Sequence, residues 1–306
     1  MSPAIARSYL GSVVTDYGGG CLPVGTIFST TLVMHKIRFS EMISVHYMST
    51  NPRNSADVHA MRSDWNERAR KNAFLYIASW NNDWDDASFF ASGEKDYQNL
   101  VAPVLQRLSL DPSDKAMAEI GCGVGRMTRS FARHFRSVFA VDISDEMQAR
   151  AKTLLSTFSN VIWILSEGQS LSGLPSNSLD FVFSYLVLQH FPSTKLVAGA
   201  IQEMIRTLKP GGVYLFQFNG LLQPTMNWKG RLLCFCLDRL ASIGLKPVSR
   251  FCAHLVDIDP QMVGKTWRGV ALTSSEVGNM VREAGGPSPA FLAENTPFAW
   301  CYGQKI

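Results

Sequence analysis

Short apolar runs alternate with amphipathic helical patterns from Lys115 onward, and this alternation limits the possible fold more than any other feature. A strand, a helix and a second strand in succession form a parallel βαβ unit, because the helix crosses back over the sheet. The predicted strands cover residues 116–120, 137–141, 161–165, 181–185, 212–218, 290–292 and 298–302. The predicted helices between them cover residues 125–135, 145–158, 194–208 and 273–284. The sequence therefore predicts an α/β fold with a mostly parallel sheet.

The rest of the chain does not share this alternation. The segment before Met61 is polar near Pro52 and lacks a helical pattern, so we expect a poorly ordered leader, with Met48 as an alternative start. Two helical patterns follow, the second of which should be kinked by its proline, Pro103. The expected organisation is a leader (1–60), N-terminal helices (61–110), an α/β core (115–220 and 271–306) and an insertion or lid (221–270).

Composition excludes several classes of protein. With 46% hydrophobic and 18% charged residues, the 306-residue chain can bury a sizeable core and is not disordered as a whole. The net charge of +4 is small and dispersed, which argues against nucleic acid or a membrane as a partner. The six cysteines are scattered, and no apolar run is long enough to span a bilayer, so a cytoplasmic location is expected.

A glycine-rich segment lies between the first predicted strand and the following helix. It reads EIGCGVG over residues 119–125, and its glycines allow a tight turn and a close approach of a ligand to the main chain. The spacing is G-x-G-x-G, whereas a nicotinamide or flavin site typically has G-x-G-x-x-G. The second predicted strand ends at Asp142, whose carboxylate can accept hydrogen bonds from both hydroxyls of a ribose. Together the two signals indicate a nucleoside-containing ligand.

Four segments in this order resemble the class I S-adenosylmethionine-dependent methyltransferases. They are EIGCGVGRMT (119–128), AVDIS (140–144), SLDFVFSYLVLQHFP (178–192) and LKPGGVYLFQF (208–218), within a resemblance that covers residues 61–304. The resemblance implies a Rossmann-like three-layer αβα sandwich with a seven-stranded sheet in the order 3-2-1-4-5-7-6. It also implies that S-adenosylmethionine binds as methyl donor at the switch point of the sheet, without a metal.

The resemblance assigns the cofactor-binding residues by position. The glycine-rich segment would line the methionine half, Asp142 would hold the ribose and Ile143 would lie against the adenine. The segment after the third strand offers Glu167, Gly168 or Gln169 near the adenine amino group. The residues expected to bind the cofactor are Glu119, Gly121, Cys122, Gly123, Gly125, Asp142, Ile143, Glu167, Gly168, Ser184 and Tyr185.

Several residues keep two interpretations. His190 is the candidate catalytic base, since its ordinary pKa is about 6.5, but it can also fix the following turn. Asn72 and Tyr76 can close over the cofactor carboxylate or pack in the core. The cysteines of the insertion lack a recognised zinc spacing and are read as packing residues. The insertion itself either forms the acceptor site or only covers the edge of the sheet.

The predicted activity is transfer of a methyl group to a small-molecule acceptor of unidentified structure. Two alternatives remain at this stage: a non-catalytic protein that binds S-adenosylmethionine or S-adenosylhomocysteine, and an NAD-dependent oxidoreductase. The residues leave the acceptor atom and the oligomeric state open.

Overall fold

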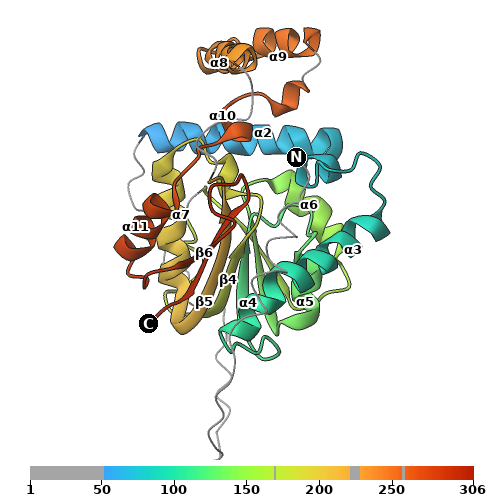
Figure 1. Cartoon of the computed structure of the whole chain (residues 1–306). Coiled ribbons are helices and arrows are strands. Elements are labelled where there is room, and N and C mark those ends of the chain that lie inside the picture. Colours follow the sequence, from blue (N-terminus) through green and yellow to red (C-terminus); the bar gives the residue numbers. More distant parts are fainter. Residues whose placement is uncertain (1–51, 169, 221–227, 257–258) are drawn as a thin grey trace, which may run out of the picture.

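A computed structural model describes residues 52–168, 170–220, 228–256 and 259–306. Its centre is a seven-stranded sheet in the order β3-β2-β1-β4-β5-β7-β6 (Figure 1). Strands β1 to β5 pair in parallel, and β7 is antiparallel to both β5 and β6. The strands are β1 (Ala116–Ile120), β2 (Ser137–Asp142), β3 (Val161–Leu165), β4 (Leu179–Ser184), β5 (Leu208–Phe218), β6 (Ala290–Leu292) and β7 (Ala299–Gln304). The predicted fold class and strand order are confirmed.

The helices between the strands begin close to where the sequence places them. They are α5 (Thr128–His134), α6 (Asp145–Leu154), α7 (Thr194–Thr207) and α11 (Ser274–Glu283). Ser144 and Ser193 cap α6 and α7 by accepting a hydrogen bond from a backbone N–H of the first turn. Thr273 caps α11 in a reciprocal capping box with Glu276.

The N-terminal helices extend further than predicted. Helix α2 (Pro52–Ile77) includes residues 52–60, so the leader was predicted to end too late; residues 1–51 lie outside the described part of the chain. The expected second helix is a run of α3 (Asp86–Asp96), η1 (Tyr97–Val101) and α4 (Ala102–Arg107). The π-helical turn η1 comes directly before Pro103, with Ala102 N donating to Tyr97 O, so the proline's effect is a widened turn.

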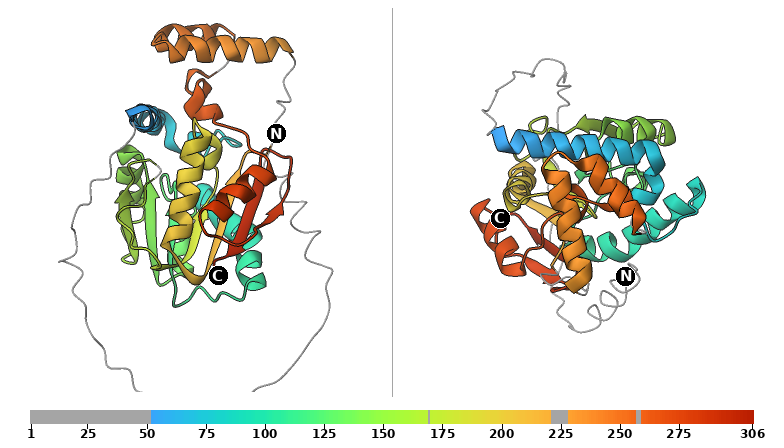
Figure 2. Two further views of the ribbon diagram at one scale, coloured as in Figure 1. Left: turned by 90° about the vertical axis from the view of Figure 1, so that its left-hand side faces the viewer. Right: turned by 90° about the horizontal axis from the view of Figure 1, so that it is seen from above.

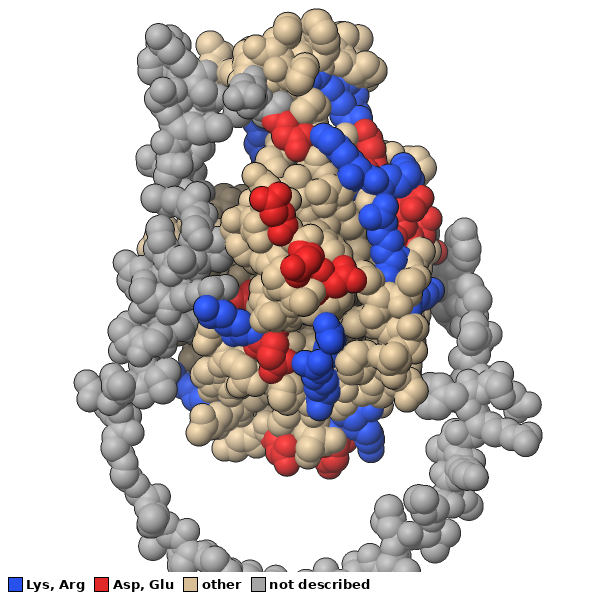
Figure 3. Space-filling model, turned by 90° about the vertical axis from the view of Figure 1, so that its right-hand side faces the viewer, with Lys and Arg blue, Asp and Glu red and all other residues tan. Residues whose placement is uncertain are grey.

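The insertion after β5 folds into helices above the carboxyl ends of the strands. It contains α8 (Trp228–Ser242), α9 (Lys246–Leu255), η3 (Pro260–Met262) and α10 (Lys265–Arg268). Figure 2 shows that α8 and α9 form an outermost layer, and that α2 and α10 lie between this layer and the sheet. In Figure 3 this outermost layer is mostly uncharged, with both basic and acidic side chains immediately below it.

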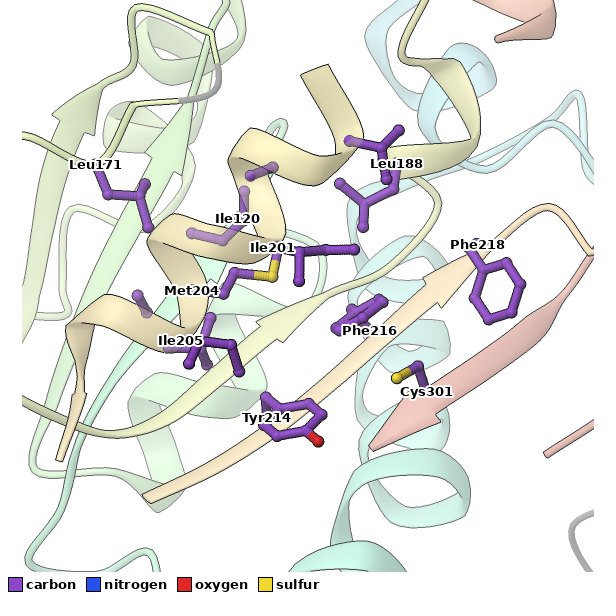
Figure 4. Packing of buried hydrophobic residues seen from close by; sticks show 14 of the residues in the cluster. Ile120, Leu171, Leu188, Ile201, Met204, Ile205, Tyr214, Phe216, Phe218 and Cys301 are labelled. Atoms are coloured by element: carbon purple, nitrogen blue, oxygen red, sulfur yellow. The ribbon is translucent and has the colours of Figure 1, made fainter. Parts of the chain in front are cut away.

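The core is divided between the two faces of the sheet because successive strand residues point to opposite sides. Phe181 and Phe183 of β4 pack with α4 and α5, whereas Val182 packs with α7 and α11 on the other face. Figure 4 shows the second face, where Ile201, Met204 and Ile205 of α7 lie over Tyr214 and Phe216 of β5. Both faces are therefore covered, as a parallel sheet requires.

Candidate active site

The glycine-rich turn after β1 is held against the end of β2. Gly121 N and Cys122 N both donate to Val141 O, at 2.7 and 3.0 Å. Gly121 and Gly123 have φ angles of +78° and +54°, in a region of backbone conformation that residues other than glycine rarely adopt. A Cβ at Gly123 would lie 2.6 Å from Ile77 Cδ1 of α2. The turn thus presents bare backbone at the carboxyl edge of the sheet.

Asp142 faces this turn from the end of β2. Its Oδ2 accepts a hydrogen bond from Gly123 N at 2.7 Å, and its Oδ1 accepts one from Ser144 N at 2.8 Å. Burial raises the pKa of Asp142, and the backbone donors of Ser144 and Gly123 oppose that rise. The carboxylate therefore fixes the position of the glycine turn and is itself held in one orientation.

Glu119 lies inside the sheet one residue before the end of β1. Its Oε2 accepts a hydrogen bond from Thr128 Oγ1 at 2.6 Å, and the residue is 4% exposed. Burial raises the pKa of Glu119 to about 8, although Thr128 and the nearby Arg126 both lower it. The side chain is therefore largely protonated near neutral pH in the protein without ligand.

A cavity of about 440 Å³ opens between these strand ends and helix α2. Its size is that of a typical small-molecule site. The predicted residues that line it are Glu119, Gly121, Cys122, Gly123, Asp142, Ile143, Gly168, Tyr185 and His190. Residues from β1, β2, the turn after β3 and the segment after β4 thus meet at one place, as the switch point of the sheet predicts.

Three predicted cofactor residues do not line the cavity. Gly125 instead faces Leu155, whose Cδ1 would lie 2.5 Å from an added Cβ, so this glycine serves close packing. Ser184 is fully buried and donates from Oγ to Ile120 O across the sheet. Glu167 is exposed beside Gly168, which does line the cavity. The contacts of Gly125, Ser184 and Glu167 with the cofactor stay predictions that the cavity lining does not support. Gln169 lies outside the described residues.

A buried arginine with two aromatic rings forms the cavity wall near Tyr185. Arg126 is 3% exposed and pairs through Nη1 with Asp96 Oδ2 at 2.8 Å. Its guanidinium lies 5.3 Å from the ring centroid of Trp80 and 5.6 Å from that of Tyr185. Sequence reasoning missed Arg126 and Trp80 as wall residues. The position of Arg126, next to the last glycine of the motif, was the available signal.

His190 is held on both ring nitrogens. Its Nδ1 faces Trp267 O, to which it donates, and its Nε2 accepts from the Gln189 side-chain amide at 3.2 Å. Burial lowers the pKa of His190 to about 4, despite the hydrogen bond to Trp267. The imidazole is therefore neutral and joins η2 (Leu188–His190) to α10. These contacts favour the turn-fixing interpretation of this residue over the catalytic one.

Helix α2 and the insertion close the cavity from above. The Trp65 ring of α2 lies 6.2 Å from that of Trp267 and 5.2 Å from that of His190, and all three residues line the cavity. Tyr76 also lines it, and its hydroxyl donates to Asp259 Oδ2 at 2.8 Å. Tyr76 thus combines the closing and packing roles that the sequence left open.

Asn72 does not reach the cavity. Its backbone is non-helical, and its Oδ1 accepts from Leu75 N at 3.1 Å, so it caps the last turn of α2 after a kink. These contacts favour a structural role for Asn72 over closure above the cofactor. Among the described residues, no group of three or more His, Cys, Asp or Glu side chains has the arrangement of a metal site.

Comparison with known proteins gives consistent matches to one enzyme class. A family described as a methyltransferase domain matches residues 118–216. Phosphoethanolamine N-methyltransferase 1 of Zea mays is 29% identical over 113 residues, covering 36% of this chain and 22% of that protein. A demethylmenaquinone methyltransferase of Tropheryma whipplei is 31% identical over 94 residues, covering 31% of this chain and 37% of that protein. The chain thus spans 22% of the length of the first relative and 37% of that of the second.

One solved structure shows the fold over most of the chain. Magnesium protoporphyrin IX methyltransferase of Synechocystis PCC 6803, with bound S-adenosylhomocysteine, has a TM-score of 0.51 at 15% identity. The match covers 82% of this chain and 100% of that one. Residues 118–216 thus match a methyltransferase domain, and the order of the seven strands together with this solved structure shows the fold of the class I S-adenosylmethionine-dependent methyltransferases.

Proposed function

We propose that this protein transfers a methyl group from S-adenosylmethionine to a small-molecule acceptor bound in the same cavity. The observation that carries the proposal is the position of Asp142 at the end of β2, across from the glycine turn after β1. A buried carboxylate beside bare backbone suits a ligand that has ribose hydroxyls at one end and an amino acid at the other.

Three features of the cavity support this donor. Each oxygen of Asp142 accepts one backbone N–H, and a carboxylate oxygen has about two lone-pair directions, so each oxygen can still accept a ribose hydroxyl. Gly121 and Gly123 leave room for the methionine half, and Ile143 and Gly168 lie where the adenine would be expected. Glu119 can ionise beside an ammonium group, because a nearby positive charge lowers the pKa of a carboxyl group.

The donor carries its methyl group on a positively charged sulfur. Once the methyl group has moved to the acceptor, this sulfur is part of a neutral thioether. The protein then has to hold the acceptor in line with that methyl group and to keep water away. Trp65, Trp80, Tyr185 and Trp267 provide apolar walls for this purpose, and Arg126 places a paired positive charge behind two of them. We assign the acceptor side of the cavity to these residues.

His190 acts as a positioning residue in this proposal. Its Nδ1–H is used by Trp267 O, and its lowered pKa makes it a weak base near neutral pH. By holding α10 in place, it sets the position of the Trp267 ring in the cavity wall. The proposal therefore does not require His190 to remove a proton from the acceptor.

The relatives support a small-molecule acceptor. Their names state phosphoethanolamine, demethylmenaquinone and magnesium protoporphyrin IX as substrates, which share little except being small molecules. The described residues contain no feature that favours the non-catalytic alternative. We also propose a reducing, cytoplasmic compartment, which suits the scattered free thiols of Cys122, Cys236, Cys252 and Cys301.

The test is transfer of a labelled methyl group. The purified full-length chain would be incubated with methyl-labelled S-adenosylmethionine and a panel of small amines, phenols and carboxylic acids, with S-adenosylhomocysteine formation as readout. We expect turnover of at least one acceptor, and loss of that turnover in Gly123→Val, whose side chain would fill the cofactor side of the cavity. Tight cofactor binding without turnover on any acceptor would favour the non-catalytic alternative.

A further inference from the structure

The exposed apolar side chains of the protein are concentrated in one hairpin of helices. Eleven large apolar residues are exposed among the described residues, and eight of them lie between Leu232 and Val256, in and around α8 and α9. Phe235, Phe251 and Leu255 are 59, 63 and 68% exposed. Exposed apolar side chains concentrated in this way mark an interaction surface.

The exposed residues form regular stripes on both helices. On α9, Val248, Phe251 and Leu255 recur at intervals of three and four residues, as do Leu232, Phe235 and Arg239 on α8. The apolar stripe of α9 lies on the opposite side of the helix from Lys246 and Arg250, given 3.6 residues per turn. We call the two stripes together the outer face of the hairpin.

Specific contacts to α2 keep this face turned outward. Arg250 makes a bidentate ion pair with Glu67, at 2.5 and 2.8 Å, and Lys246 pairs with Asp64. Leu237 of α8 and Ala253 of α9 are buried against each other and Val263, and Ser249 Oγ donates to Leu237 O at 2.7 Å. The inner side of the hairpin is therefore occupied, so the outer face cannot be covered by rotation of either helix.

The charge of the insertion indicates what covers the outer face. Lys246 and Arg250 pair with carboxylates of α2, and Arg268 pairs with Asp238, so these three cations do not serve the outer face. Arg239 lies in the α8 stripe itself, with its guanidinium 5.7 Å from the centroid of the Phe235 ring. A two-fold contact with a second copy would bury Arg239 of each copy against apolar side chains, which is unfavourable. A bilayer with anionic lipids offers hydrocarbon to the apolar stripes and a negative headgroup to Arg239.

We propose that α8 and α9 dock the protein on the surface of an anionic lipid bilayer. The hairpin lies on the membrane in this proposal, and no helix among the described residues is long and apolar enough to cross one. The proposal departs from the sequence expectation of no membrane partner, which averaged charge over the whole chain. Because Trp267 of α10 lines the cavity and α10 lies next to the hairpin layer, docking also brings this wall of the cavity to the side of the molecule that faces the lipid.

The test is flotation of the full-length chain with vesicles, which needs no turnover and is thus independent of the proposed function. Vesicles of phosphatidylcholine with an equal amount of phosphatidylglycerol would be compared with vesicles of phosphatidylcholine alone. We expect binding to the anionic vesicles that weakens with salt, and at least about tenfold weaker binding for Phe235→Ser combined with Phe251→Ser. The matched control is Ile162→Ser with Ile306→Ser, two apolar residues that are 45 and 92% exposed outside the hairpin.

Three results would overturn the proposal. One is failure of the wild-type chain to bind anionic vesicles, and another is equal binding by the hairpin variant and the wild type. The third is self-association of the wild type in sedimentation that the hairpin variant abolishes, since this would assign the outer face to a second copy. A melting temperature like that of the wild type checks that the hairpin variant is folded, as expected for exposed positions.

Discussion

Asp142 combines two tasks at one carboxylate, because it fixes the glycine turn and faces the cavity. We expect Asp142→Asn to weaken binding of S-adenosylhomocysteine about tenfold or more, since an amide replaces a charge-assisted acceptor of two hydroxyls. Asp142→Ala should also lower the melting temperature, because Gly123 N and Ser144 N would then be left without their acceptor. Calorimetric titration checks the affinity. Asp145→Asn, an exposed carboxylate in the next turn of chain, is the control, and equal affinity in Asp142→Asn would reject the ribose assignment.

Glu119 gives a prediction on stability as a function of pH. Its folded pKa of about 8 lies above the ordinary value of 4.5, so between these values the folded protein holds a proton that the unfolded chain has lost. The contribution of Glu119 to the free energy of unfolding therefore falls as pH rises across this window. Glu119→Gln removes that fall, so the melting temperature of the variant relative to wild type should increase from pH 5 to pH 8. Exposed Glu283→Gln should show no such trend, and a constant difference for Glu119→Gln would contradict a buried protonated carboxyl.

His190 should not titrate in the range where an unperturbed histidine does. Burial holds the pKa of His190 near 4. The pH profile of kcat/KM should therefore show no inflection between pH 6 and 7 that depends on this residue. His190→Asn can keep a donor toward Trp267 O, and His190→Phe cannot. The asparagine variant is expected to retain more activity than the phenylalanine variant. An inflection in the wild type that both variants lack would instead identify His190 as a general base.

At the scale of elements, α10 is joined to η2 by backbone contact as well as by His190. Gly269 ends α10 with a φ of +53°, and an added Cβ would lie 1.9 Å from Gln189 O. Gly269→Ala must therefore separate the two elements. We expect a raised acceptor KM or a lowered kcat, of about tenfold, while S-adenosylhomocysteine still binds, because Trp267 moves and the glycine turn does not.

Gly264→Ala is the matched control for this separation. Gly264 begins α10 with a φ of +102°, so alanine there also strains the backbone, but no atom lies within 4 Å of the added Cβ. Steady-state kinetics of the two variants distinguish contact with η2 from strain alone. Equal effects in both variants, or equal loss of cofactor binding in Gly269→Ala, would contradict a specific role for this junction.

At the scale of the whole molecule, the described fold draws its buried apolar side chains from residues 61–302, with Val58 packed against them. We therefore expect a chain that begins at Met48 to keep the melting temperature and the cofactor affinity of the full-length chain. Thermal denaturation and calorimetry of the two chains check this. A loss of many degrees on removal of residues 1–47 would show that they contribute to the fold.

The sheet was predictable from the sequence because each strand is a short apolar run between glycines or helices. Residues 116–120, 161–165 and 290–292 were predicted at their observed bounds, and the switch point followed from the glycine turn and Asp142. The walls of the cavity were less predictable. Arg126, Trp80 and Phe298 come from three separate regions of the chain, and only the tertiary fold brings them together.

The outcome for the insertion shows the same limit at larger scale. Its apolar and basic composition was visible, but the sequence did not show that Arg250 and Lys246 would be used by Glu67 and Asp64 of α2. That pairing decides which side of α9 faces outward. The roles of Gly125, Glu167 and Ser184 were assigned by position in a motif, and none of the three residues lines the cavity.

The most direct test of the account is a calorimetric titration of the full-length chain with S-adenosylhomocysteine and, in parallel, with NAD. The account predicts saturable binding of one S-adenosylhomocysteine per chain, at least about tenfold weaker binding in Asp142→Asn and no binding of NAD. Binding of NAD in preference to S-adenosylhomocysteine, or affinity for S-adenosylhomocysteine that neither Asp142→Asn nor Gly123→Val reduces, would contradict it.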